Sequence, residues 1–332
     1  MTQNKLILHI GTHKTGTTTL QSVMGRNREM LAEQGFCYAK TDRGPRPGDQ
    51  HHLTLQKAIL TGEAAMHAER ELLLKEFQDS GCHTLVLSIE SLSAPMIMNP
   101  KVLPLISILT EGFDTRIICV CRRQDYFIES LWNQKSKLMR TRSHIDEFIA
   151  DPASLRHMNY AKTLDAWSEF GDMTAFEFDQ AVKADLIKVF SAATGIELPV
   201  EAETRNVSPT MTVAAMLAGL NRLGIEHKWR HVEQVMDTAD KRRALGSRLR
   251  SDLLAKFAES NAELRRYGIV FSDEMPDEPT EPVAKPPDEE IMQVAAAING
   301  VERRSVGRGK RKMRRAKAGL NKSLASGPLK KT

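Results

Sequence analysis

The sequence predicts an α/β fold in which a parallel sheet is covered by helices on both faces. Apolar runs of strand length occur at residues 6–10, 84–90 and 116–121, and further strand signals occur at 36–39 and 173–179. Segments with apolar residues at helical spacing separate these runs. Strands that are apolar on both faces and alternate with helices are typical of a parallel sheet buried between two helical layers.

The helices are expected between and after these strands. The pattern is helical only from about Pro209, through the runs TVAAMLAGLNRL and DLLAKFAESNAELRRYG. This predicts a helical C-terminal part of the folded body. Another helix is expected directly after the first strand. Two more are expected within 51–80, separated near Thr61-Gly62, and further helices are expected at 125–138 and 185–194.

Composition divides the chain into three parts. Residues 1–270 carry the strand and helix signals and are expected to form one domain. Residues 271–290 are predicted to be an acidic, proline-rich linker, because 273–290 contain five prolines and eight acidic residues. Such a composition cannot bury enough apolar surface to fold. Residues 291–332 are predicted to be a basic, disordered tail.

The net charge of +5 hides a strong asymmetry. Residues 301–332 hold twelve Lys or Arg and one Glu, a net charge of +11, which leaves −6 for residues 1–300. The basic character therefore belongs to the tail, which is suited to contact an anionic surface or nucleic acid.

Targeting and metal-binding signals are weak. The N-terminal apolar run is too short for a secretory signal, and no apolar stretch reaches membrane-spanning length, which predicts a cytoplasmic protein. Four cysteines, at positions 37, 82, 119 and 121, have no zinc-binding spacing, and we expect them to be reduced and mostly buried. No metal site is expected.

The stretch HIGTHKTGTTTLQ at residues 9–21 carries the clearest functional signal. Gly11, four residues and Gly16 begin like a phosphate-binding loop, and the loop lies between a strand and a helix. Its backbone N–H groups would meet an anion at the positive end of the helix dipole. A nucleotide-binding loop has its lysine directly after the second glycine, before the residue that holds Mg²⁺. That position is Thr17 here, and the lysine is Lys14, so a metal-bound triphosphate is a poor fit and a 5′-phosphosulfate is a better one.

The residues KTGTT after an apolar strand resemble the 5′-phosphosulfate loop of sulfotransferases that use 3′-phosphoadenosine 5′-phosphosulfate (PAPS). The second motif of that family is an arginine that ends a strand, with a serine eight residues later on the next helix. RIICVCRRQDYFIES supplies Arg122 and Ser130 at that spacing. The resemblance is closest to bacterial sulfotransferase-like proteins and implies a P-loop nucleotide-kinase-like fold, PAPS as donor, and transfer of a sulfuryl group to a hydroxyl or amine.

The resemblance also implies a role for each site residue. Lys14 would neutralise charge on the bridging oxygen as the bond between phosphate and sulfate breaks. Arg122 would hold the 3′-phosphate with two hydrogen bonds, and Ser130 would add a third. The expected donor-binding residues are Gly11, Thr12, His13, Lys14, Thr15, Gly16, Thr17, Thr18, Arg122 and Ser130.

Two residues are candidates for the general base that takes the acceptor's proton. Glu90 ends the apolar strand TLVLSIE, and ligands of open parallel sheets bind at the carboxyl ends of strands. A helix-capping or ion-paired role for Glu90 fits the sequence as well. His52 precedes a helix and ranks second.

The sequence leaves two other functions open. The first is a P-loop small-molecule kinase, which the displaced lysine and the lack of a clear aspartate-ended strand oppose. The second is a binding protein without enzymatic activity, whose basic tail contacts its partner. The leading hypothesis remains a PAPS-dependent sulfotransferase that acts on a carbohydrate or small metabolite.

Overall fold

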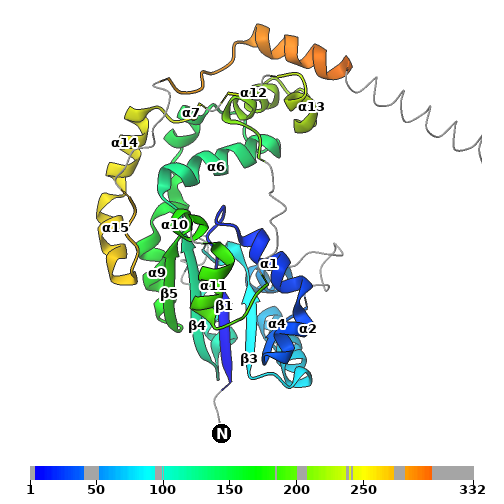
Figure 1. Cartoon of the computed structure of the whole chain (residues 1–332), viewed down its shortest axis with the longest axis vertical. Helices are drawn as coiled ribbons and strands as arrows, with labels where there is room; N and C mark the ends of the chain where they lie inside the picture. Colours follow the sequence, from blue (N-terminus) through cyan, green and yellow to red (C-terminus); the bar gives the residue numbers. More distant parts are fainter. Residues whose placement is uncertain are drawn as a thin grey trace, which may run out of the picture. The chain divides into compact units, whose positions relative to one another are not determined.

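The five expected strands form one parallel sheet in the computed structural model (Figure 1), which confirms the predicted α/β fold. The structure describes residues 4–40, 52–93, 99, 101–183, 185–199, 208–236, 239–240, 242–272 and 281–300. The strands lie in the order β2-β3-β1-β4-β5, and every neighbouring pair is parallel. The strands are β1 (Lys5–His9), β2 (Phe36–Tyr38), β3 (Thr84–Ser88), β4 (Asp114–Cys121) and β5 (Asp172–Glu177).

Helices connect the strands and continue after β5. They are α1 (Thr17–Arg26), α2 (Arg28–Glu33), α3 (Leu53–Thr61), α4 (Glu63–Ser80), α5 (Leu103–Thr110), α6 (Gln124–Lys137), α7 (Ile145–Ala150), α8 (Pro152–Leu155), α9 (Tyr160–Ser168), α10 (Phe178–Lys183), α11 (Leu186–Thr194), α12 (Met211–Arg222), α13 (Trp229–Glu233), α14 (Ser247–Lys256) and α15 (Ala258–Glu263). Short 3-10 turns are η1 (Glu90–Ser93), η3 (Arg156–Met158) and η4 (Leu264–Tyr267).

Alternate residues of the strands pack into two separate cores, one on each face of the sheet. Leu6 and Leu8 of β1 belong to a core that α3, α4, α5 and α9 cover. Ile7, between them, belongs to a core that α1, α2, α10 and α11 cover. Because successive side chains of a strand point to opposite faces, a strand buried on both faces must be apolar throughout. This is the physical reason for the continuous apolar runs in the sequence.

The strand order places a switch point at the carboxyl ends of β1 and β4. The chain leaves β1 towards β2 at one edge, whereas it leaves β4 towards β5 at the other edge. The loops that follow two such neighbouring strands diverge and leave a crevice between them, where open α/β sheets bind their ligands. The loop after β1 and the turn after β4 are the two segments that carry the candidate motifs.

The chain groups into two compact units, which differs from the expected single domain over 1–270. The first unit contains Met1–Leu131, Ile149–Asn206 and Ser247–Asp277, and holds the whole sheet. The second contains Trp132–Phe148 and Val207–Gly246, together with residues that follow Asp277. Every site residue discussed below, from the loop after β1 to Arg250, belongs to the first unit.

The second unit is built around α12 and includes a helix over residues 288–300. The linker expected at 271–290 and the tail expected from 291 therefore differ from the structure where it describes them. Ile291, Ala295 and Ile298 form an apolar stripe at helical spacing and are buried against α12. A side-chain carbon at Gly219 of α12 would lie 2.6 Å from the end of the Ile291 side chain, so the two helices approach closely at this glycine. Residues 273–280 and 301–332 lie outside the described residues.

Candidate functional site

The candidate site lies at the carboxyl edge of the sheet, where the loop 11–18, Glu90, Arg122 and Asp179 follow β1, β3, β4 and β5 respectively. Parallel strands bring their carboxyl ends to one edge, so residues far apart in sequence come together there. The structure thus brings together three of the groups that the sequence predicted for the site: the loop, Glu90 and Arg122.

The loop 11–18 begins as a continuation of β1 against β4. The Thr12 N–H donates to the Val120 carbonyl oxygen over 2.8 Å, and the Thr12 hydroxyl donates to the same oxygen over 3.0 Å. Gly11 has φ of +100°, and a Cβ there would lie 2.8 Å from the Glu90 carbonyl oxygen. Only glycine allows the loop to pass this close to the end of β3. Thr12 is therefore a structural anchor of the loop, and not a free donor for a ligand.

The second half of the loop turns into helix α1. Lys14 has φ of 64° and Gly16 has φ of 73°, and a Cβ at Gly16 would lie 2.4 Å from the Leu186 side chain. Helix α1 begins at Thr17, so the N–H groups of Thr17 and Thr18 belong to a first turn that has no acceptors within the helix. The first turn of α1 contains no acidic residue. These amides and the helix dipole make the loop suited to an anion.

Glu90 lies beside this loop, and each of its carboxylate oxygens is close to a loop side chain. The Thr17 hydroxyl donates to Oε2 over 2.5 Å, and His13 Nδ1 lies 3.1 Å from Oε1. About 38% of the Glu90 side chain and 30% of the His13 side chain are exposed, so solutes can reach both. The sequence indicated a carboxylate at this strand end, but the pairing with His13 could not be predicted, because 77 residues separate the two.

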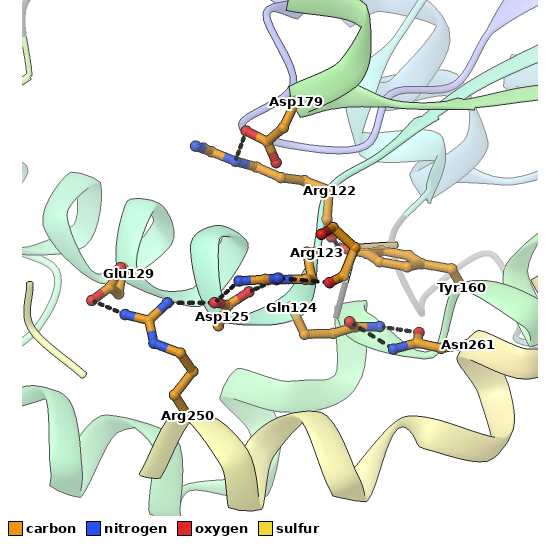
Figure 2. Close-up of polar contacts among 10 residues, drawn as sticks. Arg122, Arg123, Gln124, Asp125, Glu129, Tyr160, Asp179, Arg250 and Asn261 are labelled. Carbon is orange, nitrogen blue, oxygen red and sulfur yellow. Dashed lines mark hydrogen bonds and ion pairs between the residues drawn. The ribbon is translucent and has the colours of Figure 1, made fainter. Parts of the chain in front are cut away.

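Arg122 extends from the end of β4 to the loop. Its Nη1 donates to the Lys14 carbonyl oxygen over 3.4 Å. Figure 2 shows its contact with Asp179, whose Oδ1 lies 3.7 Å from Nε. The guanidinium also lies 5.0 Å from the centre of the Phe178 ring. Tyr160 donates its hydroxyl proton to the Arg122 carbonyl oxygen over 2.8 Å, which fixes the backbone. Arg122 is therefore held at the loop with about 20% of its side chain exposed.

The neighbouring Arg123 turns away from Arg122 and joins a buried ion-pair network (Figure 2). Arg123 donates to both carboxylate oxygens of Asp125, over 2.8 and 2.9 Å. Arg250 of α14 donates to Asp125 and lies 3.7 Å from Glu129. Burial alone would raise the pKa of Asp125, but the hydrogen bond and charge of Arg123, with those of Arg250, outweigh it and lower that pKa. Buried ion pairs thus hold the turn after β4 in place.

Gln124 fixes the same turn to α15. Its side-chain amide donates to Asn261 Oδ1 over 2.6 Å, and Asn261 donates back over 3.1 Å. The exchange of two hydrogen bonds orients both amides and satisfies their buried polar atoms. Together, the contacts of Arg123, Gln124 and Asp125 hold the first residues of α6, so that Arg122 projects towards the loop.

Ser130 lies half-buried on α6, one turn beyond Tyr126. The Arg122 guanidinium lies 5.9 Å from the centre of the Tyr126 ring. Residues four apart share a helix face, so Ser130 lies on the face that Tyr126 presents towards Arg122. The expected association of Ser130 with Arg122 stays a prediction.

His52 is held away from the candidate chemistry. Its side chain is 2% exposed. The Ser88 N–H donates to Nδ1 over 3.1 Å, and Nε2 lies 3.1 Å from the Ala39 carbonyl oxygen. Nδ1 also lies 3.3 Å from the Ser88 carbonyl oxygen, so backbone groups contact both ring nitrogens. The role of His52 in this structure is to join the start of α3 to β3, and a role as general base would need the ring to leave these partners.

A second buried histidine, His9, was not singled out from the sequence. It ends β1 with no exposed surface, and its Nδ1 lies 2.8 Å from the Ser88 hydroxyl. Burial lowers the pKa of His9 to about 4, against a smaller raising effect of the Glu90 charge. His9 is therefore neutral at pH 7. The only sequence signal was a polar residue within an apolar strand.

Within the part of the chain that the structure describes, no three His, Cys, Asp or Glu side chains group as they would to hold a metal ion. A cavity of about 500 Å³ lies at the β2 edge, between α2 and α4, and none of the candidate site residues lines it. No helix among the described residues has the length and apolar character that crossing a membrane requires.

Comparison with known proteins identifies no family. No protein-family model matches the chain, and no curated protein matches it. Among solved structures, the chain is similar to one from the PezAT chromosomal toxin-antitoxin system of the human pathogen Streptococcus pneumoniae. The two are 12% identical, with a TM-score of 0.27, over 80% of this chain and 88% of that chain. At this TM-score the similarity carries no argument about function.

Proposed function

We propose that this chain is a PAPS-dependent sulfotransferase, which transfers a sulfuryl group to a hydroxyl or amine of a carbohydrate or small metabolite. The observation that carries the proposal is the meeting of two anion-binding elements at the switch point. Arg122, from the end of β4, donates to the backbone of Lys14 in the loop after β1. A donor with separate anionic groups at its 5′ and 3′ positions suits two such elements.

The loop suits the 5′-phosphosulfate. The amides of Thr17 and Thr18 and the dipole of α1 favour an anion, and Lys14 adds a full positive charge from within the turn. A lysine in this place can stabilise the negative charge that develops on the bridging oxygen of the phosphosulfate. A group that stabilises charge only in the transition state lowers the barrier more than it strengthens binding.

Arg122 suits the 3′-phosphate. A guanidinium binds a phosphate through two parallel hydrogen bonds, a geometry that an ammonium group cannot match. The carboxylate of Asp179 lies 3.7 Å from Nε of Arg122 and, like a phosphate, is an anionic hydrogen-bond acceptor. The phosphate would compete with Asp179 for this arginine, while the contacts of Tyr160 and of the turn after β4 keep the backbone in place.

The reaction needs no metal to balance its charges. The acceptor oxygen or nitrogen forms a bond to sulfur, the bond from sulfur to the bridging oxygen breaks, and that oxygen keeps the electron pair. The acceptor's proton passes to a general base, for which Glu90 is the first candidate. The products are the sulfated acceptor and 3′-phosphoadenosine 5′-phosphate. A cytoplasmic location, and contact of the basic tail with an anionic surface or nucleic acid, stay predictions.

Thermal unfolding with candidate nucleotides tests the proposal. A ligand that binds only the folded state at 100 times its Kd adds about 2.7 kcal/mol of stability. We expect 3′-phosphoadenosine 5′-phosphate in excess EDTA to raise the Tm clearly, and adenosine 5′-phosphate, the matched control without the 3′-phosphate, to raise it much less. Stabilisation by Mg-ATP, with no effect of the bisphosphate, would favour the kinase alternative.

A further inference from the structure

In the second unit, the end of helix α6 exposes apolar and basic side chains side by side. Leu138 and Met139 are 45% and 56% exposed. The surrounding residues 134–142, QKSKLMRTR, contain four Lys or Arg and no acidic residue. A single exposed apolar side chain is common in folded proteins, so a contact surface at this place needs support from the way the turn is built.

The backbone at the end of α6 gives the first such support. The Arg140 N–H donates to the Lys135 carbonyl oxygen over 2.7 Å, and the Met139 N–H donates to the Ser136 carbonyl oxygen over 3.2 Å. These two bonds form the helix-ending motif in which the residue at the position of Met139 is left-handed and usually glycine. Met139 has φ of 55°, a conformation that is unfavourable for a residue with a side chain. The chain thus keeps a large apolar side chain where glycine would be more stable.

Helix α12 holds the same turn at its base. Asn221 is 6% exposed, and its side-chain amide donates to the carbonyl oxygens of Ser136 and Thr141, each over 2.9 Å. His227 Nε2 lies 2.8 Å from Asn221 Oδ1, on the other side of the amide. The two carbonyl groups flank residues 137–140, so the base of the turn is fixed while its apolar tip is exposed.

Trp229 of α13 lies beside the turn and gathers two cations. Lys137 Nζ lies 4.3 Å from the centre of the Trp229 ring, and the guanidinium carbon of Arg230 lies 5.5 Å from it. Burial and then the charge of Arg230 lower the pKa of Lys137, against a raising effect of Glu233. The basic-apolar patch is defined as these cations and the ring together with the turn, and consists of Lys137, Leu138, Met139, Arg140, Trp229 and Arg230.

We propose that the basic-apolar patch attaches this chain to the surface of an anionic lipid bilayer. Its cations would meet the anionic headgroups, while Leu138 and Met139 would enter the boundary between headgroups and acyl chains. Tryptophan is favoured at this interface because its ring is apolar and its N–H is polar. Nucleic acid would also attract the cations, but it offers little to two exposed aliphatic side chains.

The basic tail would strengthen this attachment. Residues 301–332, with a net charge of +11, follow the helix 288–300, which packs against α12 in the same unit. A run of basic residues is attracted to an anionic membrane and adds to the effect of an apolar anchor. The attachment concerns a surface of the second unit and does not depend on the proposed sulfuryl transfer.

Flotation of the whole chain with vesicles tests the apolar part of the patch. The vesicles would be phosphatidylcholine with about one third phosphatidylglycerol, which carries the negative charge. We expect Leu138→Ser combined with Met139→Gly to lower vesicle affinity by about tenfold. The Tm should not fall, because glycine suits the conformation at position 139. The matched control is Leu60→Ser combined with Leu72→Ser, two exposed leucines of the first unit, and should leave the affinity unchanged.

The basic part of the patch has its own variant. Each cation near an anionic membrane contributes about fivefold, so Arg140→Gln combined with Arg230→Gln should lower vesicle affinity by about 25-fold. Vesicles of phosphatidylcholine alone should bind the wild type far more weakly. Equal binding to both kinds of vesicle, or wild-type affinity in the variant without Leu138 and Met139, would overturn the proposal.

A fluorescent side chain at the tip of the turn detects insertion directly. We expect the emission of Leu138→Trp to be quenched by phospholipids with brominated acyl chains more strongly than that of the wild type, and Leu60→Trp to show no added quenching. Because this readout is a gain of signal, loss of folding cannot imitate it. Quenching no stronger than in the wild type would overturn the proposal. Binding of a single-stranded oligonucleotide without binding of the anionic vesicles would also overturn it and would assign the cations to nucleic acid.

Discussion

Arg122 donates a hydrogen bond from Nη1 to the backbone carbonyl oxygen of Lys14 over 3.4 Å, although 108 residues separate them. The contact joins the turn after β4 to the loop after β1, on the two sides of the switch point of the sheet. It also fixes the loop from the outside, so that its backbone conformation depends on more than its own sequence. The two motifs of the sequence thus meet at one edge of the sheet.

Replacement of Lys14 should affect turnover more than binding. A pre-organised charge at a developing oxyanion contributes roughly 3–4 kcal/mol, so Lys14→Ala should lower turnover of PAPS by about 10²- to 10³-fold. Affinity for 3′-phosphoadenosine 5′-phosphate, measured by calorimetry, should fall much less. Normal turnover in Lys14→Ala would remove Lys14 from the leaving-group role.

Replacement of Arg122 should reveal which end of the nucleotide it holds. Loss of a charge-assisted contact costs about 2 kcal/mol or more, so Arg122→Ala should weaken binding of 3′-phosphoadenosine 5′-phosphate by roughly 30-fold. Adenosine 5′-phosphate, which lacks the 3′-phosphate, should bind almost as well as to the wild type. Equal weakening for the two nucleotides would show that Arg122 does not hold the 3′-phosphate.

The buried ion pair beside Arg122 should be sensitive to the loss of one partner. Asp125 is fully buried between Arg123 and Arg250, so Asp125→Asn leaves buried charges uncompensated and should lower the free energy of unfolding by about 3–5 kcal/mol. The control is Asp79→Asn, which removes an exposed pair with Lys75 in the same unit and should cost about 0.5 kcal/mol or less. Similar costs in urea unfolding would contradict the account of the network.

His9 should make the stability depend on pH. Its pKa is lowered to about 4 in the folded chain, so between pH 6.5 and 4 the unfolded chain binds more protons and stability falls as the pH falls. A difference of about 2.5 pKa units corresponds to about 3 kcal/mol over that range. His9→Gln should show a shallower loss of stability between pH 6.5 and 4 in urea unfolding. Equal slopes in the two proteins would contradict the burial of a neutral His9.

Much of the fold could be predicted because its signals are local. A strand buried on both faces must be apolar throughout, so the three long apolar runs could be recognised without any knowledge of their neighbours. The turn at 11–18 could also be recognised locally. Its glycines have positive φ angles that other residues rarely adopt, so their spacing in the sequence indicates the turn. Arg122 was indicated by the resemblance to sulfotransferases, which have an arginine at the end of a strand and a serine eight residues later.

The contacts that could not be predicted join residues that lie far apart in the sequence. Glu90 could be placed at the edge of the sheet, but its contacts with His13 and Thr17 depend on how closely the loop passes β3. Nothing near Arg250 indicates that its guanidinium reaches Asp125, 125 residues earlier. The burial of His52 depends on backbone groups of two other segments.

The helix at 288–300 shows how composition can hide a periodic pattern. The prolines and acidic residues before it predicted a linker, although the spacing of Ile291, Ala295 and Ile298 is helical. An isolated helix of this length is marginally stable in water, so its stability depends on burial of that stripe against α12. A partner surface of this kind cannot be read from local composition.

Transfer of labelled sulfate in the absence of free metal tests the central claim most directly. The chain would be incubated in excess EDTA with ³⁵S-labelled PAPS and with metabolite and polysaccharide extracts of the cells that make it. The account predicts that label passes to material in the extract, that added magnesium changes the rate little, and that Lys14→Ala loses the transfer. No transfer by the wild type, or transfer that strictly requires magnesium, would contradict the proposal that this site moves a sulfuryl group with Lys14 and the start of α1 as its charge-balancing groups.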